Sequence, residues 1–389
     1  MKNENYVARD IEAENLNVVA SDGSYLITDD GKRYLDLEMG WCVGNIGWTK
    51  DDVVKAIKNF TGPTYVLPGY LYNEWEELAK ILAEITPGNL SKTFRATGGT
   101  EAVEIALQAA MKHTGRNEFI SIEDSYHGHS IGAMSVGASY FRDWYTNLLP
   151  NCHKIQVPLD EKAAIKVEEL LKTKKIAAFI CEPIICNLGV EIPTKEFFTR
   201  VQKACKETGT LLIADEVATG FGRTGKMFAS EHYDLKPDIM TLGKAITGGY
   251  AALGATITTP EVAKSMEFDF SHYSTFGWQP LNTVVTLANV KSLLVQKDSL
   301  LENVQRTSEY FVSRLEKMNF KSPVKIIAKG LAIAIHISDP NYLNEIIKKA
   351  FEHKLLILPL EDHSITIFPN LAIDMKTAEE AMDLLEKSV

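Results

Sequence analysis

Short apolar runs that end on polar residues alternate with amphipathic stretches along most of the chain. Runs with the length and composition of a buried strand cover residues 119–122, 177–181, 211–214 and 239–242. Apolar residues recur at helical spacing over residues 51–60, 74–85, 103–111, 281–301, 301–320 and 378–386. This alternation predicts an α/β fold with a mostly parallel sheet.

The two ends of the chain have a different pattern. Alternating residues on both sides of Asp30-Gly31 predict a β-hairpin with this pair in its turn. Near the C-terminus, residues 324–337 alternate as one half-buried strand would, and 355–359 with 365–369 complete a small sheet. We expect three parts: an N-terminal arm and hairpin (1–48) packing with the small domain, a large cofactor-binding domain (49–285) and a small C-terminal α+β domain (286–389).

Two neighbouring apolar runs end on residues whose side chains can take part in catalysis. One ends on Asp215, and the other ends on Gly243-Lys244. Ligands of open α/β sheets bind at the carboxyl ends of the strands, so these two side chains can face one ligand. Pyridoxal phosphate chemistry uses such a pair, because a lysine amine forms a Schiff base with the cofactor and a carboxylate keeps its pyridine nitrogen protonated. The alternative interpretation is a solvated lysine and a helix-capping aspartate.

A glycine turn at Gly98-Gly99 precedes a predicted helix. Free N–H groups at a helix start attract anions, and glycine lets a phosphate approach the backbone closely. Further along, His127 and His129 form an H-x-H pair. No third ligand lies nearby in the sequence, so we predict no metal site.

The motifs DEVATGFGRTG and GKAITGG resemble the signature of class III (ornithine/ω-type) aminotransferases, and the resemblance runs from about Asp22 to the C-terminus. It implies a fold type I enzyme that depends on pyridoxal 5'-phosphate. Its large domain would hold a mostly parallel seven-stranded sheet sandwiched by helices, beside a small α+β C-terminal domain. Lys244 would form the Schiff base and later act as the base, and Asp215 would keep the cofactor ring protonated.

The resemblance also implies further contacts with the cofactor. Gly99 and Thr100 would hold its phosphate, and Tyr126 and Val217 would sandwich its ring. Thr275 would reach the phosphate in the neighbouring subunit, so we expect a homodimer with shared active sites. The remaining expected cofactor contacts are His127 and Glu182.

Three departures from the family pattern concern the substrate. Many members have an arginine at the positions of His129 and Thr366, and a glutamate at the position of Asn187. Loss of both carboxylate-binding arginines favours an amine, ω-amino compound or apolar amino acid as the donor, with a keto acid such as pyruvate as the acceptor. Candidate walls for such a substrate are Trp41, Trp48, Tyr140, Trp144 and Trp278, with packing as the alternative role for the tryptophans. Arg142 and Arg95 are the remaining candidates for binding a carboxylate.

The composition narrows the possible partners. A formal net charge of −10 and a pI near 5.5 argue against nucleic acid or an anionic membrane as a partner. No run approaches the roughly 18 apolar residues of a membrane span, and the N-terminus lacks a signal-peptide core. The 5 cysteines include no C-x-x-C pair, which disfavours a disulfide framework and a zinc site. We therefore expect buried cysteines in a cytoplasmic protein whose partners are small molecules.

Other functions compete with transamination. A racemase, epimerase or aminomutase of the same family would use the same residues, because the motifs do not record how the substrate carbon is reprotonated. A phospho-lyase is less favoured, since the sequence shows no additional basic phosphate cluster. A cofactor-binding protein without turnover is disfavoured by the presence of Lys244, Asp215 and Thr275. The sequence also lacks the early G-x-G-x-x-G of a nicotinamide-binding enzyme.

Overall fold

The computed structural model describes residues 16–268, 272–360 and 363–389. Its largest element is a seven-stranded sheet with the order β4-β10-β9-β8-β7-β5-β6. Strands β5 to β9 are parallel, whereas β10 is antiparallel to both of its neighbours. The strands are β4 (Lys92–Ala96), β5 (Glu118–Ile122), β6 (Cys152–Ile155), β7 (Ile176–Cys181), β8 (Leu211–Asp215), β9 (Ile239–Leu242) and β10 (Gly254–Thr258). The predicted mostly parallel sheet is confirmed.

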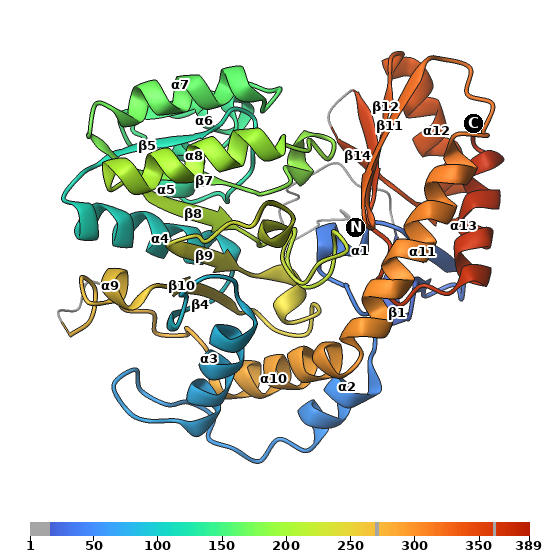
Figure 1. Ribbon diagram of the computed structural model, residues 1–389. Coiled ribbons are helices and arrows are strands. Elements are labelled where there is room, and N and C mark those ends of the chain that lie inside the picture. Colours follow the sequence, from blue (N-terminus) through green and yellow to red (C-terminus); the bar gives the residue numbers. More distant parts are fainter. Residues whose placement is uncertain (1–15, 269–271, 361–362) are drawn as a thin grey trace, which may run out of the picture.

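Helices cover both faces of this sheet (Figure 1). One face carries α4 (Gly99–Thr114), and the other carries α7 (Glu161–Leu171) and α8 (Lys195–Thr208). Successive residues of β7 point to opposite faces, so Phe179 packs in the α7–α8 core and Ile180 in the α4 core. Burial on both faces explains why the central strands are continuous apolar runs rather than alternating ones.

The other helices include those predicted over residues 51–60, 74–85, 281–320 and 378–386. They are α1 (Met39–Cys42), α2 (Asp51–Lys58), α3 (Asn73–Ile85), α5 (Ile131–Ser135), α6 (Ser139–Arg142), α9 (Pro260–Ala263), α10 (Pro280–Val295), α11 (Lys297–Leu315), α12 (Pro340–Glu352) and α13 (Met375–Glu386). Three 3₁₀ helices are η1 (Cys186–Leu188), η2 (Ala229–Tyr233) and η3 (Lys244–Ile246). The predicted domain boundary at 285/286 falls inside α10, which joins the two regions as one continuous helix.

The N-terminal hairpin shares a sheet with the C-terminal region. Its strands are β1 (Val18–Asp22), β2 (Tyr25–Thr28) and β3 (Arg33–Asp36), and β13 (Leu355–Leu356) pairs in parallel with β3. The predicted turn is confirmed, because Gly31 has φ +79° and its N–H donates to the carbonyl of Thr28 over 2.9 Å.

A second four-stranded sheet has the order β11-β12-β15-β14. Its strands are β11 (Val324–Lys329), β12 (Ala332–Ile337), β14 (Leu358–Leu360) and β15 (Ser364–Ile367). The prediction of one strand over 324–337 is wrong, because Gly330, at φ +57°, makes a tight turn between antiparallel β11 and β12. Alternation continues on both sides of that turn, so the pattern alone does not reveal it.

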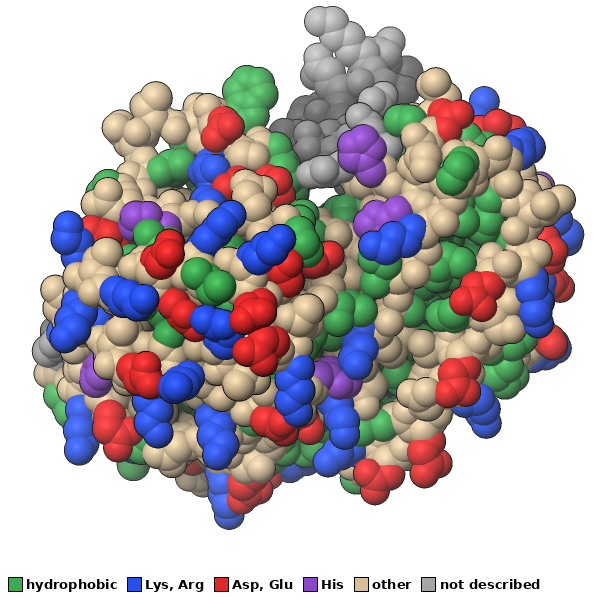
Figure 2. Space-filling view, turned by 45° about the horizontal axis from the view of Figure 1, so that its top comes forward, with side chains coloured by type: hydrophobic (Ala, Val, Ile, Leu, Met, Phe, Trp, Pro, Cys, Tyr) green, Lys and Arg blue, Asp and Glu red, His purple; other side chains and the backbone are tan. Residues whose placement is uncertain are grey.

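The visible face of the molecule has two lobes with a groove between them (Figure 2). Charged side chains of both signs are interspersed over the visible face of both lobes. Within the described residues, no helix is long and apolar enough to cross a membrane.

Candidate active site

A cavity lies between the carboxyl ends of the large-sheet strands and the C-terminal sheet. Asp215, the last residue of β8, and Lys244, two residues beyond β9, both line it. Lys244 has φ +46°, a left-handed conformation that costs a non-glycine residue about 1–2 kcal/mol. Such strain persists only where the surrounding structure enforces it, and it is concentrated at functional sites.

The Asp215 carboxylate is held by hydrogen bonds at both oxygens. Oδ1 accepts from the N–H of Val217 over 3.1 Å and from Oγ1 of Thr241 over 2.9 Å. Oδ2 lies 2.6 Å from Nδ1 of His127, and both of these side chains are buried. Thr241 is placed by the parallel pairing of β8 with β9, which sets it opposite Asp215. The fold therefore fixes one carboxylate orientation at this wall.

The start of α4 forms an anion-binding corner of the cavity. Gly98 precedes the helix without any side-chain cap, and Gly99 and Thr100 line the cavity. A Cβ atom on Gly99 would come within 2.8 Å of Cγ1 of Val217, so only glycine fits there. Uncapped N–H groups and the helix dipole suit a phosphate at this position.

Two further predicted cofactor residues, Tyr126 and Glu182, also line the cavity. The Glu182 carboxyl group is buried, and its Oε2 accepts from the N–H of Cys186 over 3.4 Å. Within the described residues, Oε1 has no hydrogen-bond partner. Burial, together with the charge of Asp215, raises the pKa of Glu182 well above its usual value. The neutral carboxylic acid is therefore favoured, with one oxygen available to a bound group.

The opposite wall is formed by the C-terminal sheet and is mainly apolar. Thr366 is buried, and its hydroxyl donates to the carbonyl of Leu358 over 3.3 Å. Among the described residues that line the cavity, Lys244 carries the only lysine or arginine side chain. The other residues of this wall are Leu358, Leu360, Phe368 and, from α1, Trp41.

Two predicted substrate residues do not line this cavity. His129 is exposed, and its Nδ1 lies 3.0 Å from the hydroxyl of Tyr126. Trp278 is buried in the core, where its indole N–H donates to the carbonyl of Gly254 over 2.7 Å. The structure thus corrects the interpretation of Trp278 as a pocket wall, because its ring is fully enclosed by core packing. Thr275 is exposed and does not line the cavity of its own chain.

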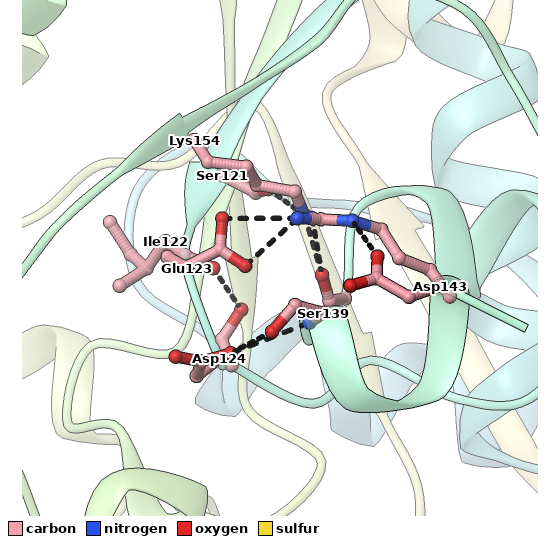
Figure 3. Close-up of polar contacts among 10 residues, drawn as sticks. Ser121, Ile122, Glu123, Asp124, Ser139, Asp143 and Lys154 are labelled. Atoms are coloured by element: carbon pink, nitrogen blue, oxygen red, sulfur yellow. Dashed lines mark hydrogen bonds and ion pairs between the residues drawn. The ribbon is translucent and has the colours of Figure 1, made fainter.

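The arginines considered as carboxylate binders are engaged elsewhere. Arg142 donates to both carboxylate oxygens of Glu123, over 2.9 and 3.3 Å, in the polar cluster of Figure 3. Arg95 stacks over the ring of Trp75, with 3.7 Å between its guanidinium carbon and the ring centre. Trp48 donates to Asp36 over 2.9 Å and does not line the cavity.

Two residues that line the cavity, Cys42 and Cys186, are ones for which the sequence predicts only burial. Cys186 lies four residues after Glu182, and Cys42 follows Trp41, so their neighbours in the sequence were the available signal. In the described part of the chain, no three His, Cys, Asp or Glu side chains gather as a metal site would require.

The chain is similar to known proteins over almost its whole length. The family model for class III aminotransferases matches residues 6–389. Putrescine aminotransferase of Pectobacterium atrosepticum is 35% identical over 384 residues, covering 95% of this chain and 82% of that protein. Acetylornithine aminotransferase of Methanosarcina mazei is 34% identical over 379 residues, covering 95% and 91%. The crystal structure of a Bacillus anthracis aminotransferase superposes with a TM-score of 0.90 at 25% identity, covering 98% and 96% of the two chains.

Proposed function

The chain belongs to the class III aminotransferases, and on that premise we propose that its amino donor is an amine or ω-amino compound whose reacting carbon carries no carboxylate. The family and the aminotransferase relatives make the chain a pyridoxal-phosphate-dependent transaminase of fold type I, so the reaction is transfer of an amino group from a donor to a keto acid. The apolar wall around Thr366 carries the proposal about the donor.

The residues of the cavity fit pyridoxal phosphate. The N–H groups of Gly99 and Thr100 would bind its phosphate, Asp215 its pyridine nitrogen, and Tyr126 and Val217 the faces of its ring. Lys244 would hold it covalently. When bound, the cofactor supplies an electron sink for the carbon that bears the amine.

Lys244 and Glu182 would then act on protons. Lys244, through a free Nζ, would take the proton from the amine-bearing carbon of the donor. The neutral carboxyl of Glu182, with its unpartnered Oε1, would donate a hydrogen bond into the same space. Trp41 and the leucines of β14 would exclude water from the donor side chain.

The donor class is supported by the cavity lining, in which the described residues include no guanidinium. A donor carboxylate placed against Thr366 would face Leu358 and Leu360 without a cation to compensate its desolvation. The uncharged side chain of Asn187 does not compensate either. Its Nδ2 already donates to the carbonyl of Asp124 over 3.1 Å and to the hydroxyl of Tyr140 over 2.7 Å. No observation favours the racemase, epimerase or aminomutase alternative.

The test is a single-turnover experiment with the holoenzyme and no keto acid. We expect butane-1,4-diamine and simple primary amines to discharge the visible absorbance of the bound cofactor faster than glutamate does. Pyruvate should then restore that absorbance. Fast discharge by glutamate, with tight saturation by 2-oxoglutarate in the reverse half-reaction, would contradict the proposed donor class.

We also propose a homodimer in which Thr275 of the partner subunit completes each active site. The surroundings of this residue support it, because Tyr273 and Phe276 are 51% and 62% exposed and Tyr65, whose ring contacts that of Phe276, is 40% exposed. Exposed apolar side chains of this kind mark association surfaces. The cytoplasmic location expected from the sequence stays a prediction.

Hybrid dimers test the shared site. Lys244→Ala and Thr275→Asp subunits, each inactive alone, should regain activity when refolded together. One site of the hybrid would then combine the intact lysine of one subunit with the intact threonine of the other. No recovery in hybrids isolated as dimers would place Thr275 outside the partner's site.

A further inference from the structure

The side chain of Asn187, in the 3₁₀ helix η1, lines the cavity that contains Lys244. It is buried, with 9% of its surface exposed. Its Nδ2 donates to the backbone carbonyl of Asp124 over 3.1 Å and to the hydroxyl of Tyr140 over 2.7 Å. An amide nitrogen has two N–H groups, so both of them are engaged within the protein.

These two hydrogen bonds fix the orientation of the amide. A backbone carbonyl can only accept a hydrogen bond, so the atom beside the carbonyl of Asp124 is the nitrogen, because the reversed amide would set Oδ1 against another oxygen. Within the described residues, Oδ1 accepts no hydrogen bond, and it is not one of the enclosed side-chain atoms. Because the rest of the side chain is buried, the free oxygen of Asn187 opens on the cavity.

We propose that Asn187 is a specificity-determining residue whose Oδ1 accepts a hydrogen bond from a primary ammonium at the far end of the amino donor. Given the proposed donor class, on which this assignment rests, the preferred members are diamines and other amines with a second cationic group. An amide oxygen can only accept, and an ammonium can only donate. A hydrogen bond between them is charge-assisted and therefore stronger than one between neutral groups.

The charged groups of the cavity favour a cation over an anion beside Oδ1. The described lining residues include the carboxyl groups of Asp215 and Glu182 and a single lysine or arginine side chain, that of Lys244. The amine of Lys244 would be bonded to the cofactor, so it would not repel an ammonium. A carboxylate at the far end of the amino donor would instead meet an oxygen that has no proton to give, and a buried charge without a partner is unfavourable.

The segment that carries Asn187 is packed against the C-terminal sheet. Gly189 has φ +61°, and its carbonyl accepts from Nε2 of His336 over 2.9 Å. A Cβ atom on Gly189 would overlap the imidazole of His336 and come within 3.3 Å of Oγ of Ser364, so only glycine allows this close approach. Ser364 lies on β15, two residues before Thr366. Asn187 and the apolar wall around Thr366 therefore bound the same space for the amino donor.

Tyr140 is a positioning residue for Asn187. Its hydroxyl accepts from Nδ2, and its ring packs on that of Phe141 with 4.3 Å between the ring centres. Phe141 in turn packs on the rings of Tyr126 and His129, with ring centres 5.5 and 4.3 Å away. This aromatic packing restrains the hydroxyl of Tyr140, and the hydroxyl restrains the amide of Asn187.

The first test compares three amino donors of similar length with the wild-type holoenzyme and pyruvate: butane-1,4-diamine, pentan-1-amine and 4-aminobutanoate. Their far ends are an ammonium, a methyl group and a carboxylate. We expect kcat/KM to be highest for the diamine and lower by about 10-fold or more for 4-aminobutanoate, since a charged hydrogen bond contributes about 1.5–3 kcal/mol. An equal or higher value for 4-aminobutanoate would overturn the role of Asn187. It would leave the proposed donor class intact, because the reacting carbon of that compound also carries no carboxylate.

The second test removes the amide. Asn187→Leu keeps the size of the side chain, and the ratio of kcat/KM for butane-1,4-diamine to that for pentan-1-amine should fall about 10- to 100-fold. A general disturbance of the site would lower both values together, so the ratio separates recognition of the ammonium from a structural role. Asn344→Leu, at an exposed asparagine of α12, is the matched control and should keep the wild-type ratio. A wild-type ratio in folded Asn187→Leu would overturn the assignment.

Tyr140→Phe removes the hydroxyl that restrains the amide but leaves Oδ1 in place. It should lower the same ratio less than Asn187→Leu does, whereas an equal or larger loss would assign recognition to the phenol and overturn the role of the amide. If Asn187→Leu fails to fold, the comparison of the three amino donors in the wild type still decides. Failure of all three to react, with fast discharge of the cofactor absorbance by glutamate, would overturn the proposed donor class and this assignment with it.

Discussion

Nδ1 of His127 lies 2.6 Å from Oδ2 of Asp215, and neither side chain is accessible to solvent. The imidazole orients the carboxylate that we propose binds the cofactor's pyridine nitrogen. His127→Phe keeps the ring but removes this hydrogen bond. Hydrogen bonds to charged groups contribute about 1.5–3 kcal/mol, so cofactor affinity should fall about 10- to 100-fold. Equilibrium titration of the apoprotein with pyridoxal phosphate measures the change.

Ser125 provides the control for that variant. Its hydroxyl lies 3.2 Å from the other ring nitrogen, Nε2, and donates to the carbonyl of Ile122 over 2.8 Å. Ser125→Ala leaves the contact with Asp215 intact and should weaken cofactor binding much less. If both variants lose the same affinity for pyridoxal phosphate, the position of the imidazole ring, and not its contact with Asp215, determines that affinity.

Replacement of Lys244 should abolish turnover. Lys244→Ala removes both the covalent attachment and the proposed base, while the circular dichroism spectrum should stay that of the folded protein. Lys226→Ala, at an exposed lysine, is the matched control and should keep full activity. Measurable multiple turnovers by the Lys244→Ala variant would refute the assignment.

Trp278 offers a test of core packing against substrate contact. Trp278→Ala should lower the free energy of unfolding by about 3–5 kcal/mol, as for other large core truncations, which urea denaturation can measure. Trp144, which is 85% exposed, is the control, and its replacement by alanine should change that free energy by less than about 0.5 kcal/mol. A Trp278→Ala variant with normal stability and altered KM for the donor would restore the pocket interpretation.

Sequence patterns located the strands and turns that carry most of the candidate cofactor residues. The apolar run that ends on Asp215 and the glycine turn before Thr100 have local causes, namely burial on both faces and a helix start without a side-chain cap. Both features can be read from a few neighbouring residues. The sequence alone therefore predicts that these residues belong to the candidate site.

Features that depend on tertiary contacts could not be read in this way. The enclosure of Trp278 depends on Gly254, and the presence of both Cys42 and Cys186 at one cavity depends on the fold of two distant loops. The sequence also left open whether Arg142 faced the cavity, which its ion pair with Glu123 settles. In each case the deciding partner lies far away in the sequence.

The amine of Lys154 makes stability depend on pH. It donates to Oγ of Ser121 over 2.9 Å and to the carbonyl of Gly137 over 2.6 Å (Figure 3). Burial, followed by the charge of Arg142, lowers the pKa of Lys154 from 10.5 to about 7. Between these values the unfolded chain binds more protons than the folded one, so this group makes the free energy of unfolding rise with pH. The destabilisation of the folded protein by this lowered pKa is complete below pH 7 and disappears above pH 10.5.

Lys154→Met removes this titration. The stability of the wild type relative to the variant should therefore increase from pH 7 to 10, by at most about 1.4 kcal/mol for each unit of the pKa difference. Urea denaturation at several pH values measures it. Lys162→Met, at an exposed lysine, should leave the pH dependence of the wild type unchanged. A parallel pH dependence in wild type and Lys154→Met would show that the amine has an ordinary pKa.

Introduction of a guanidinium at Thr366 should change the donor class. Thr366 is buried against Leu358 and lines the apolar wall, so an arginine there can extend into the cavity and bind a carboxylate through two hydrogen bonds. Thr366→Arg should raise kcat/KM for glutamate about 10- to 100-fold, since a charged hydrogen bond contributes about 1.5–3 kcal/mol. It should lower kcat/KM for butane-1,4-diamine, whose distal ammonium would meet a like charge.

Thr366→Met separates charge from volume, because methionine adds bulk to the wall without a cation. It should reduce activity with every donor by filling the cavity and should not favour glutamate. Steady-state kinetics with both donors in both variants decide the matter. If arginine and methionine change the two donors in the same proportion, size alone governs selection, and the missing cation at Thr366 does not explain the proposed preference.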